Sequence, residues 1–224
     1  MNIKINEEEY LELGLYVENS YVIGSRLYNT HTEDSDYDIL YIIKPFLKSD
    51  NYYPNWHQFQ YDSEDGTRQN MFTTKERFYR NLFSGESTIN ADIIMFTDFD
   101  DLSPSEKLNY CRTYNVIKAF LGFAKRDLNR YNSGKNKHFH AARSIYCAEK
   151  LMNNELPKLE ELSKYVILGF AELMTKCVDL RKVCNNMMDN KELTIFPKEL
   201  IFEPKSSLER KIMEANNILE FKYN

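Results

Sequence analysis

Residues 24–38 read GSRLYNTHTEDSDYD, and this stretch decides the fold because it joins two apolar, β-rich runs. The run over residues 20–23 ends at Gly24-Ser25, and a longer run over residues 37–43 begins within Asp36-Tyr37-Asp38. The segment between the two runs is polar and acidic. The sequence therefore predicts a strand that delivers a glycine and a hydroxyl to a helix start, and a second strand that begins at two acids.

Each part of this stretch suits the binding of a nucleoside triphosphate. Gly24 lets the backbone approach a phosphate closely, Ser25 can donate to a phosphate oxygen, and amides at a following helix start favour anions. Residues i and i+2 of a strand point to the same face, so Asp36 and Asp38 would lie side by side while Tyr37 turns into the core. Hard oxygen ligands so placed favour Mg²⁺.

The stretch resembles the Gly-Ser then Asp-x-Asp signature of nucleotidyltransferases of the DNA polymerase beta superfamily, which move a nucleoside monophosphate from a nucleoside triphosphate to a hydroxyl. Gly-Ser-Arg-x-Tyr-x-Thr, followed by acid-Ser-Asp-x-Asp, is similar more narrowly to the RNA-repair-associated family of predicted nucleotidyltransferases. Residues 78–96 and 120–151 also resemble segments of that family. The resemblance implies an NTP and Mg²⁺ as ligands and favours an RNA 3′ end as the acceptor.

The sequence departs from the family pattern at two places near these motifs. Asn29 stands where the family usually has glycine, and Glu86-Ser87 replaces an Asn-Pro pair after Gly85. A third departure bears on catalysis, because the family's third carboxylate normally sits on a neighbouring strand and helps to activate the incoming hydroxyl.

The expected strand over residues 68–74 offers no such acid, since Gln69 and Met71 stand at the two best positions. Asp62, at the end of the preceding strand, could supply the carboxylate if that strand lies beside Asp36 and Asp38. Asp62 is therefore our candidate for the third catalytic acid.

Three basic residues form a second candidate site in the helical half. Lys137, His140 and Arg143 follow one another at about helical spacing, so they share a helix face that could hold phosphate or RNA. An exposed basic face with one satisfied histidine is the alternative, and His138 points to another side.

Arg26 also has two interpretations. It stands at the mouth of the predicted phosphate loop, where it could contact the triphosphate, or it could form an ion pair with Asp34 or Glu33.

Periodicity predicts an α+β protein whose strands lie mainly in residues 1–100 and whose residues 101–224 are helical. The resemblance implies that residues 1–100 form a nucleotidyltransferase-type mixed β-sheet core and that the helical domain over 101–224 covers its cleft. Ser103-Pro104-Ser105-Glu106 predicts a capped helix start. Strands are expected over 20–23, 37–43, 56–62, 68–74 and 91–96, and helices over 6–16, from 74 to Gly85, from 103 to 132, over 137–153, over 157–188 and from 206.

The composition sets outer limits on function. A chain of 224 residues with a net charge of −5 argues against coating nucleic acid through bulk electrostatics, so any polynucleotide site must be local. The four cysteines show no Cys-x-x-Cys spacing and are expected to be reduced and buried. No signal or membrane-spanning pattern is visible, so we expect a cytoplasmic protein without a membrane partner. The sequence does not indicate an oligomeric state.

Two function classes follow. The first is a magnesium-dependent nucleotidyltransferase acting on RNA during end processing or repair, with a protein or small-molecule hydroxyl as the alternative acceptor. The second is a catalytically silent nucleotide- or RNA-binding module, in which the pocket survives without the third acid.

Overall fold

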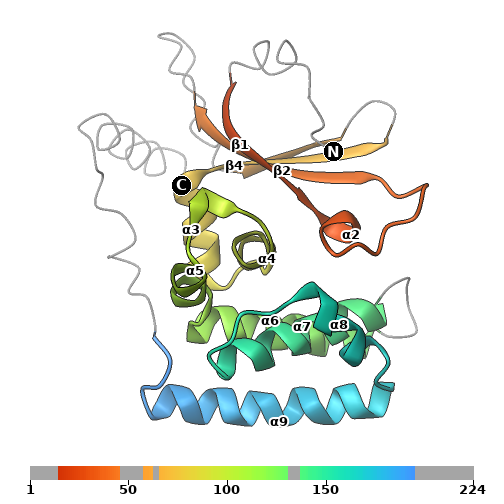
Figure 1. Cartoon of the computed structure of the whole chain (residues 1–224), viewed down its shortest axis with the longest axis vertical. Coiled ribbons are helices and arrows are strands. Elements are labelled where there is room, and N and C mark those ends of the chain that lie inside the picture. The colour runs from red at the N-terminus through yellow and green to blue at the C-terminus, as the bar shows by residue number, and fades with distance from the viewer. Residues whose placement is uncertain (1–14, 46–57, 63–65, 131–136, 195–224) are drawn as a thin grey trace, which may run out of the picture. The chain divides into compact units, whose positions relative to one another are not determined.

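The computed structural model describes residues 15–45, 58–62, 66–130 and 137–194, and every structural statement below concerns these residues. The protein is α+β, with a mixed sheet and a set of helices (Figure 1). Its internal contacts divide it between Tyr79 and Arg80, so the described sheet belongs to one compact unit and residues 80–194 to the other. The sequence predicted a domain boundary about 20 residues later, near residue 100.

The sheet has four strands in the order β1-β2-β4-β3. Antiparallel pairing joins β1 to β2 and β3 to β4, whereas β2 and β4 are parallel. The strands are β1 (Leu15–Ile23), β2 (Tyr37–Pro45), β3 (Gln58–Asp62) and β4 (Arg68–Thr74). The predictions for residues 20–23, 37–43 and 68–74 are confirmed, and that for 56–62 is confirmed over 58–62.

The start of β1 corrects one prediction. Leu15 and Tyr16 were expected to end a helix over residues 6–16, but they pair with Pro45 and Lys44 of β2. Partners across the sheet therefore override a weak local helical pattern. Residues 6–14 lie outside the described part of the chain.

Strand β2 forms the centre of the sheet because it is apolar on both faces. Ile39 and Ile43 pack with Tyr41 and Phe72 in one buried cluster, and the rings of Tyr41 and Phe72 stack with centroids 4.8 Å apart. Leu40 and Ile42 point to the opposite face and are equally buried. The strand that carries Asp38 is therefore fixed by packing on both sides.

The short helix α2 (Gly24–Leu27) follows β1, and the remaining helices follow the sheet. These are α3 (Lys75–Ser84), α4 (Ile89–Phe96), the 3₁₀ turn η1 (Phe99–Asp101), α5 (Pro104–Cys111), α6 (Tyr114–Asn129), α7 (Lys137–Met152), α8 (Leu159–Val166) and α9 (Phe170–Asp189). The helix predicted from 206 lies outside the described residues.

The strand predicted over residues 91–96 was wrong, because this segment belongs to helix α4. The helix is buried from Asn90 to Met95, and such a helix is not amphipathic. A short apolar run of this kind cannot be told from a buried strand by its period.

Local end signals explain most of the helix boundaries. At the start of α5, Ser103 Oγ accepts from the Glu106 amide at 3.4 Å and Glu106 Oε2 accepts from the Ser103 amide at 2.9 Å; this capping box confirms the predicted capped start. The helix expected from 103 to 132 is interrupted at Arg112-Thr113, where Thr113 caps α6. The one expected over 157–188 is divided at residues 167–169 into α8 and α9.

Gly85 ends α3 as the sequence predicted, with a φ of +71°. A Cβ atom at this position would lie 2.5 Å from the carbonyl oxygen of Asn115, so the close approach of α6 also requires glycine. The side-chain amide of Asn115 donates to the carbonyl of Phe83 at 2.9 Å and satisfies the end of α3.

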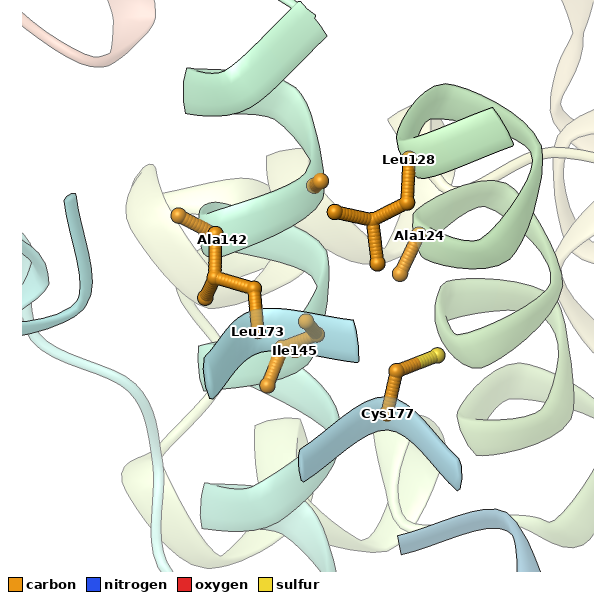
Figure 2. Close-up of a cluster of buried hydrophobic side chains, with 7 residues drawn as sticks. Ala124, Leu128, Ala142, Ile145, Leu173 and Cys177 are labelled. Carbon is orange, nitrogen blue, oxygen red and sulfur yellow. The ribbon is translucent and has the colours of Figure 1, made fainter. Parts of the chain in front are cut away.

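The core of the helical unit lies where α6, α7 and α9 meet (Figure 2). Small side chains let these helices approach closely, and the cluster consists of Ala124, Leu128, Ala141, Ala142, Ile145, Leu173 and Cys177. All four cysteines are free and buried, as predicted. Among the described helices, none combines the length and apolar character that a bilayer crossing would need.

Candidate functional site

The centre of the candidate site is the contact between Gly24 and Asp38. Ile23, the last residue of β1, pairs with Asp38 near the start of β2, so the turn after β1 lies beside the carboxylate. Gly24 has a φ of +65°, and a Cβ atom there would overlap Oδ2 of Asp38 and lie 2.9 Å from its Cγ. The sequence suggested that Gly24 makes room for a phosphate, but in the structure the same space admits the carboxylate of Asp38.

Asp36 and Asp38 interact electrostatically, although they differ in their surroundings. Asp36 is exposed just before β2 begins, whereas Asp38 is half-buried within the strand. Burial is the main cause that raises the pKa of Asp38, and the negative charge of Asp36 raises it further. The two carboxylates therefore repel each other, which is the electrostatic condition that a bound cation relieves.

Arg26 holds the approach to this pair in place. Its Nε donates to the carbonyl oxygen of Asp36 at 3.1 Å, and its Nη2 donates to that of Ser35 at 2.6 Å. The guanidinium also lies 3.6 Å from the centroid of the Tyr37 ring. The alternative in which Arg26 pairs with Asp34 or Glu33 is not seen among the described residues, since Nε and Nη2 of Arg26 donate to main-chain carbonyls.

The turn between the two motifs is built from local hydrogen bonds. The carbonyl of Ser25 accepts from the amide of Thr30 at 2.9 Å and from its hydroxyl at 3.2 Å. Asn29 has a φ of +56°, the conformation that glycine favours and that asparagine tolerates better than other residues. Asn29 therefore takes a glycine-like conformation, at the position where the family that the sequence resembles usually has glycine.

The neighbouring strand places Gln69 beside Asp38. Strand β4 runs parallel to β2 with Gln69 in register with Asp38 and Met71 in register with Leu40. Residues in register on adjacent strands share a face, so the β4 residue beside Asp38 is an amide and not an acid.

Strand order contradicts the premise that made Asp62 the third acid. Strand β3 lies beside β4 and not beside β2, and Asp62 is in register with Gln69. Two strand spacings, about 10 Å, therefore separate the backbone of Asp62 from that of Asp38. The sequence could not reveal this, because the parallel pairing of β2 with β4 inserts one strand between them.

On α7, Arg143 and Lys137 both have acidic partners. Arg143 Nη1 lies 3.4 Å from Oδ2 of the buried Asp92, with 11% of the Arg143 side chain exposed. Lys137 Nζ lies 3.7 Å from Oδ1 of Asp127, which is also buried. Sequence reasoning missed both acids as partners, and Asp92 was hidden within a segment predicted to be a strand.

His140 stands among these charges. Burial is the main cause that lowers its pKa, the positive charge of Arg143 adds to it, and Asp127 opposes the change. His138, expected to be incidental, has Nε2 2.8 Å from the carbonyl oxygen of Val166 and so connects α7 to the end of α8. The arrangement on α7 accounts for these residues largely through contacts within the protein.

Comparison with models of known protein families and with curated proteins found no match to this chain. Among the described residues, no group of three or more His, Cys, Asp or Glu side chains is placed to hold a metal ion. The site is therefore defined by its own geometry: a carboxylate pair, one member of which packs against a glycine turn at the end of a strand.

Proposed function

We propose that this protein is a magnesium-dependent nucleotidyltransferase that moves a nucleoside monophosphate from an NTP to a hydroxyl. The observation that supports the proposal best is the seating of the Asp38 carboxylate against Gly24, with the charge of Asp36 close enough to raise its pKa. Because the position of the Asp38 carboxylate requires a glycine at residue 24, the Gly-Ser turn and the Asp-x-Asp pair lie in direct contact.

The carboxylate pair fits Mg²⁺. This ion is commonly bound by one or two carboxylates together with substrate phosphates, and it keeps several waters. Asp36 and Asp38 would hold it, and when bound it would supply positive charge against the negative charge that develops on the triphosphate. Asp36 is exposed and Asp38 is half-buried, so the pair is accessible from solvent.

The other residues of the site have separable roles. Ser25 makes no side-chain hydrogen bond with any described residue, so its hydroxyl is available to donate to a phosphate oxygen. Arg26 uses its donors on the main chain of Ser35 and Asp36, so its role is to hold Asp36 in position. We therefore assign phosphate contact to Ser25 and positioning to Arg26.

Gln69 determines how the acceptor would be activated. An amide cannot take a proton from an attacking hydroxyl, whereas a carboxylate can act as a general base. The proton of the acceptor therefore leaves to solvent, and turnover is expected to be slow. An RNA 3′ end is our preferred acceptor because of the sequence resemblance, and a protein or small-molecule hydroxyl is the alternative.

The position of Gln69 beside Asp38 also favours one rival, a catalytically silent module that binds a nucleotide or RNA. The two proposals differ in a single step. Both predict Mg²⁺-dependent NTP binding, but only the enzyme releases pyrophosphate.

The test is pyrophosphate release from labelled NTPs with Mg²⁺ and a pool of short RNAs. Wild type should release pyrophosphate slowly, Gln69→Asp should release it faster because it restores a proton acceptor, and Asp38→Asn should release none. Gln69→Asn is the matched control, since it changes size without adding an acid. NTP binding without release in wild type would establish the silent module, and no Mg²⁺-dependent NTP binding would overturn both proposals.

A further inference from the structure

The surface along the seam where α6 packs against α9, called the α6–α9 groove below, combines positive charge with an absence of acids on the two helix flanks. The two helices pack in antiparallel orientation, because Cys177 Sγ lies 3.7 Å from the carbonyl oxygen of Leu121 and the Tyr114 hydroxyl lies 3.4 Å from Oδ1 of Asn185. In Figure 1, α9 runs along the layer that α6 to α8 form. Lys118 of α6 and Arg181 of α9 both lie midway between these two contacts, so they are opposite each other.

Helical periodicity defines the two flanks of this groove. Each helix has a row of residues next to its buried contacts, on the side where the two helices meet. At 3.6 residues per turn, these two rows contain no Asp or Glu. The flank of α6 contains Tyr114, Lys118, Gly122, Lys125 and Asn129, and that of α9 contains Met174, Val178, Arg181, Asn185 and Met188.

The three cations of this groove have no acidic partner among the described residues. Lys118 and Lys125 are exposed, and neither they nor Arg181 forms an ion pair there. The Lys118 ammonium lies 5.2 Å from the ring centroid of Tyr114, so it contacts an aromatic face. Lys118, Lys125 and Arg181 therefore form a local positive patch in a protein whose net charge is −5.

The electrostatics of two cysteine thiols on α9 also indicate that the three cations lie near one another. Burial raises the pKa of Cys177, and the charges of Arg181 and Lys125 oppose this rise. Burial also raises the pKa of Cys184, and the charges of Lys118 and Arg181 oppose that rise. The three positive charges therefore act on one short stretch of α9.

Gly122 gives an independent sign that this surface is kept open. It lies in the middle of α6, where glycine costs about 1 kcal/mol of helix stability relative to alanine. A Cβ atom there would meet nothing within 4 Å, so packing does not require the glycine. An exposed, bare section of helix between Lys118 and Lys125 leaves room for a ligand to approach the backbone.

We propose that the groove lined by Lys118, Lys125 and Arg181 binds the phosphodiester backbone of a single-stranded polynucleotide. Phosphates spaced along a strand match cations spread along two helices, and such contacts carry no base preference. This proposal goes beyond nucleotidyl transfer and does not depend on it. It also places polynucleotide binding on a surface different from the Lys137, His140 and Arg143 face.

The test is fluorescence anisotropy of a labelled 12-nucleotide RNA, and of DNA of the same sequence, against the full chain over a series of salt concentrations. The variant carries Lys118→Ala, Lys125→Ala and Arg181→Ala. The matched control carries Lys158→Ala, Lys164→Ala and Lys182→Ala, which remove the same charge from exposed positions elsewhere. Unfolding midpoints show that each variant is folded.

The groove variant should bind both strands about tenfold more weakly at 0.1 M salt, and its salt slope should fall by about 2, since each lost contact with a single strand contributes about 0.7. The control should bind like wild type. Equal losses in the two variants, or no loss in the groove variant, would overturn the proposal, as would a polyglutamate peptide that binds the groove more tightly than either strand. Asp38→Asn should keep full strand binding, so failure of the groove and failure of the transferase proposal give different results.

Discussion

Replacing Gly24 by alanine perturbs the centre of the site by one methyl group. Gly24 has a φ of +65°, which costs an L-residue about 1–2 kcal/mol. The added Cβ would also overlap the Asp38 carboxylate, and overpacking of this kind costs about 1–3 kcal/mol more. We therefore expect Gly24→Ala to lower the free energy of unfolding by about 2–5 kcal/mol in total.

Gly66 provides a matched control for the backbone part of this cost. It has a φ of +66°, but a Cβ atom there would meet nothing within 4 Å. Gly66→Ala should therefore lower the free energy of unfolding by the conformational cost alone, about 1–2 kcal/mol. The difference between the two variants isolates the contact with Asp38.

Urea unfolding of both variants, and of Gly24→Ala combined with Asp38→Ala, measures these quantities. Removing the carboxylate should recover the steric part of the loss, so the two changes should not be additive. Equal losses at Gly24 and Gly66, or strictly additive losses at Gly24 and Asp38, would refute the reasoning that Gly24 is required by Asp38.

Three further predictions follow from the charges. Burial, and then the charge of Asp36, raise the pKa of Asp38 above its ordinary 3.8, so ionising Asp38 lowers the stability of the folded state as the pH rises above that value. Asp38→Asn should therefore be more stable than wild type at neutral pH. Urea unfolding should show that this difference vanishes below about pH 3.8. Arg143→Ala should lower the free energy of unfolding by about 3 kcal/mol because it removes an ionic partner of a buried carboxylate, and by clearly less in an Asp92→Asn background; an equal loss in both backgrounds would contradict the pairing. Asp62→Asn should leave pyrophosphate release unchanged, since β4 separates it from Asp38, and a large loss of rate would return Asp62 to the site.

Much of the sheet could be predicted because its strands are short, apolar and bounded by polar turns. Strand β4 was found with its observed limits, and Gly24 and Asp38 were assigned to one site before any geometry was known. Helix α4 could not be found, since burial on all sides removes the amphipathic period on which such predictions depend.

Strand order and main-chain contacts lie outside what periodicity can show. Nothing in the sequence indicates that β4 inserts between β2 and β3, so the placement of Asp62 beside Asp38 failed. Arg26 was assigned to phosphate or to acids because side-chain partners can be proposed from a sequence, whereas its actual acceptors are carbonyl groups.

The most direct test of the central claim is calorimetric titration of Mg²⁺ with a non-hydrolysable NTP analogue into wild type, Asp36→Asn and Asp38→Asn. If the two carboxylates form the metal site, wild type should bind the analogue only with Mg²⁺, and each variant should lose this metal-dependent binding while keeping its fold. Binding that is equally strong with a chelator present, or that survives in both variants, would contradict the claim.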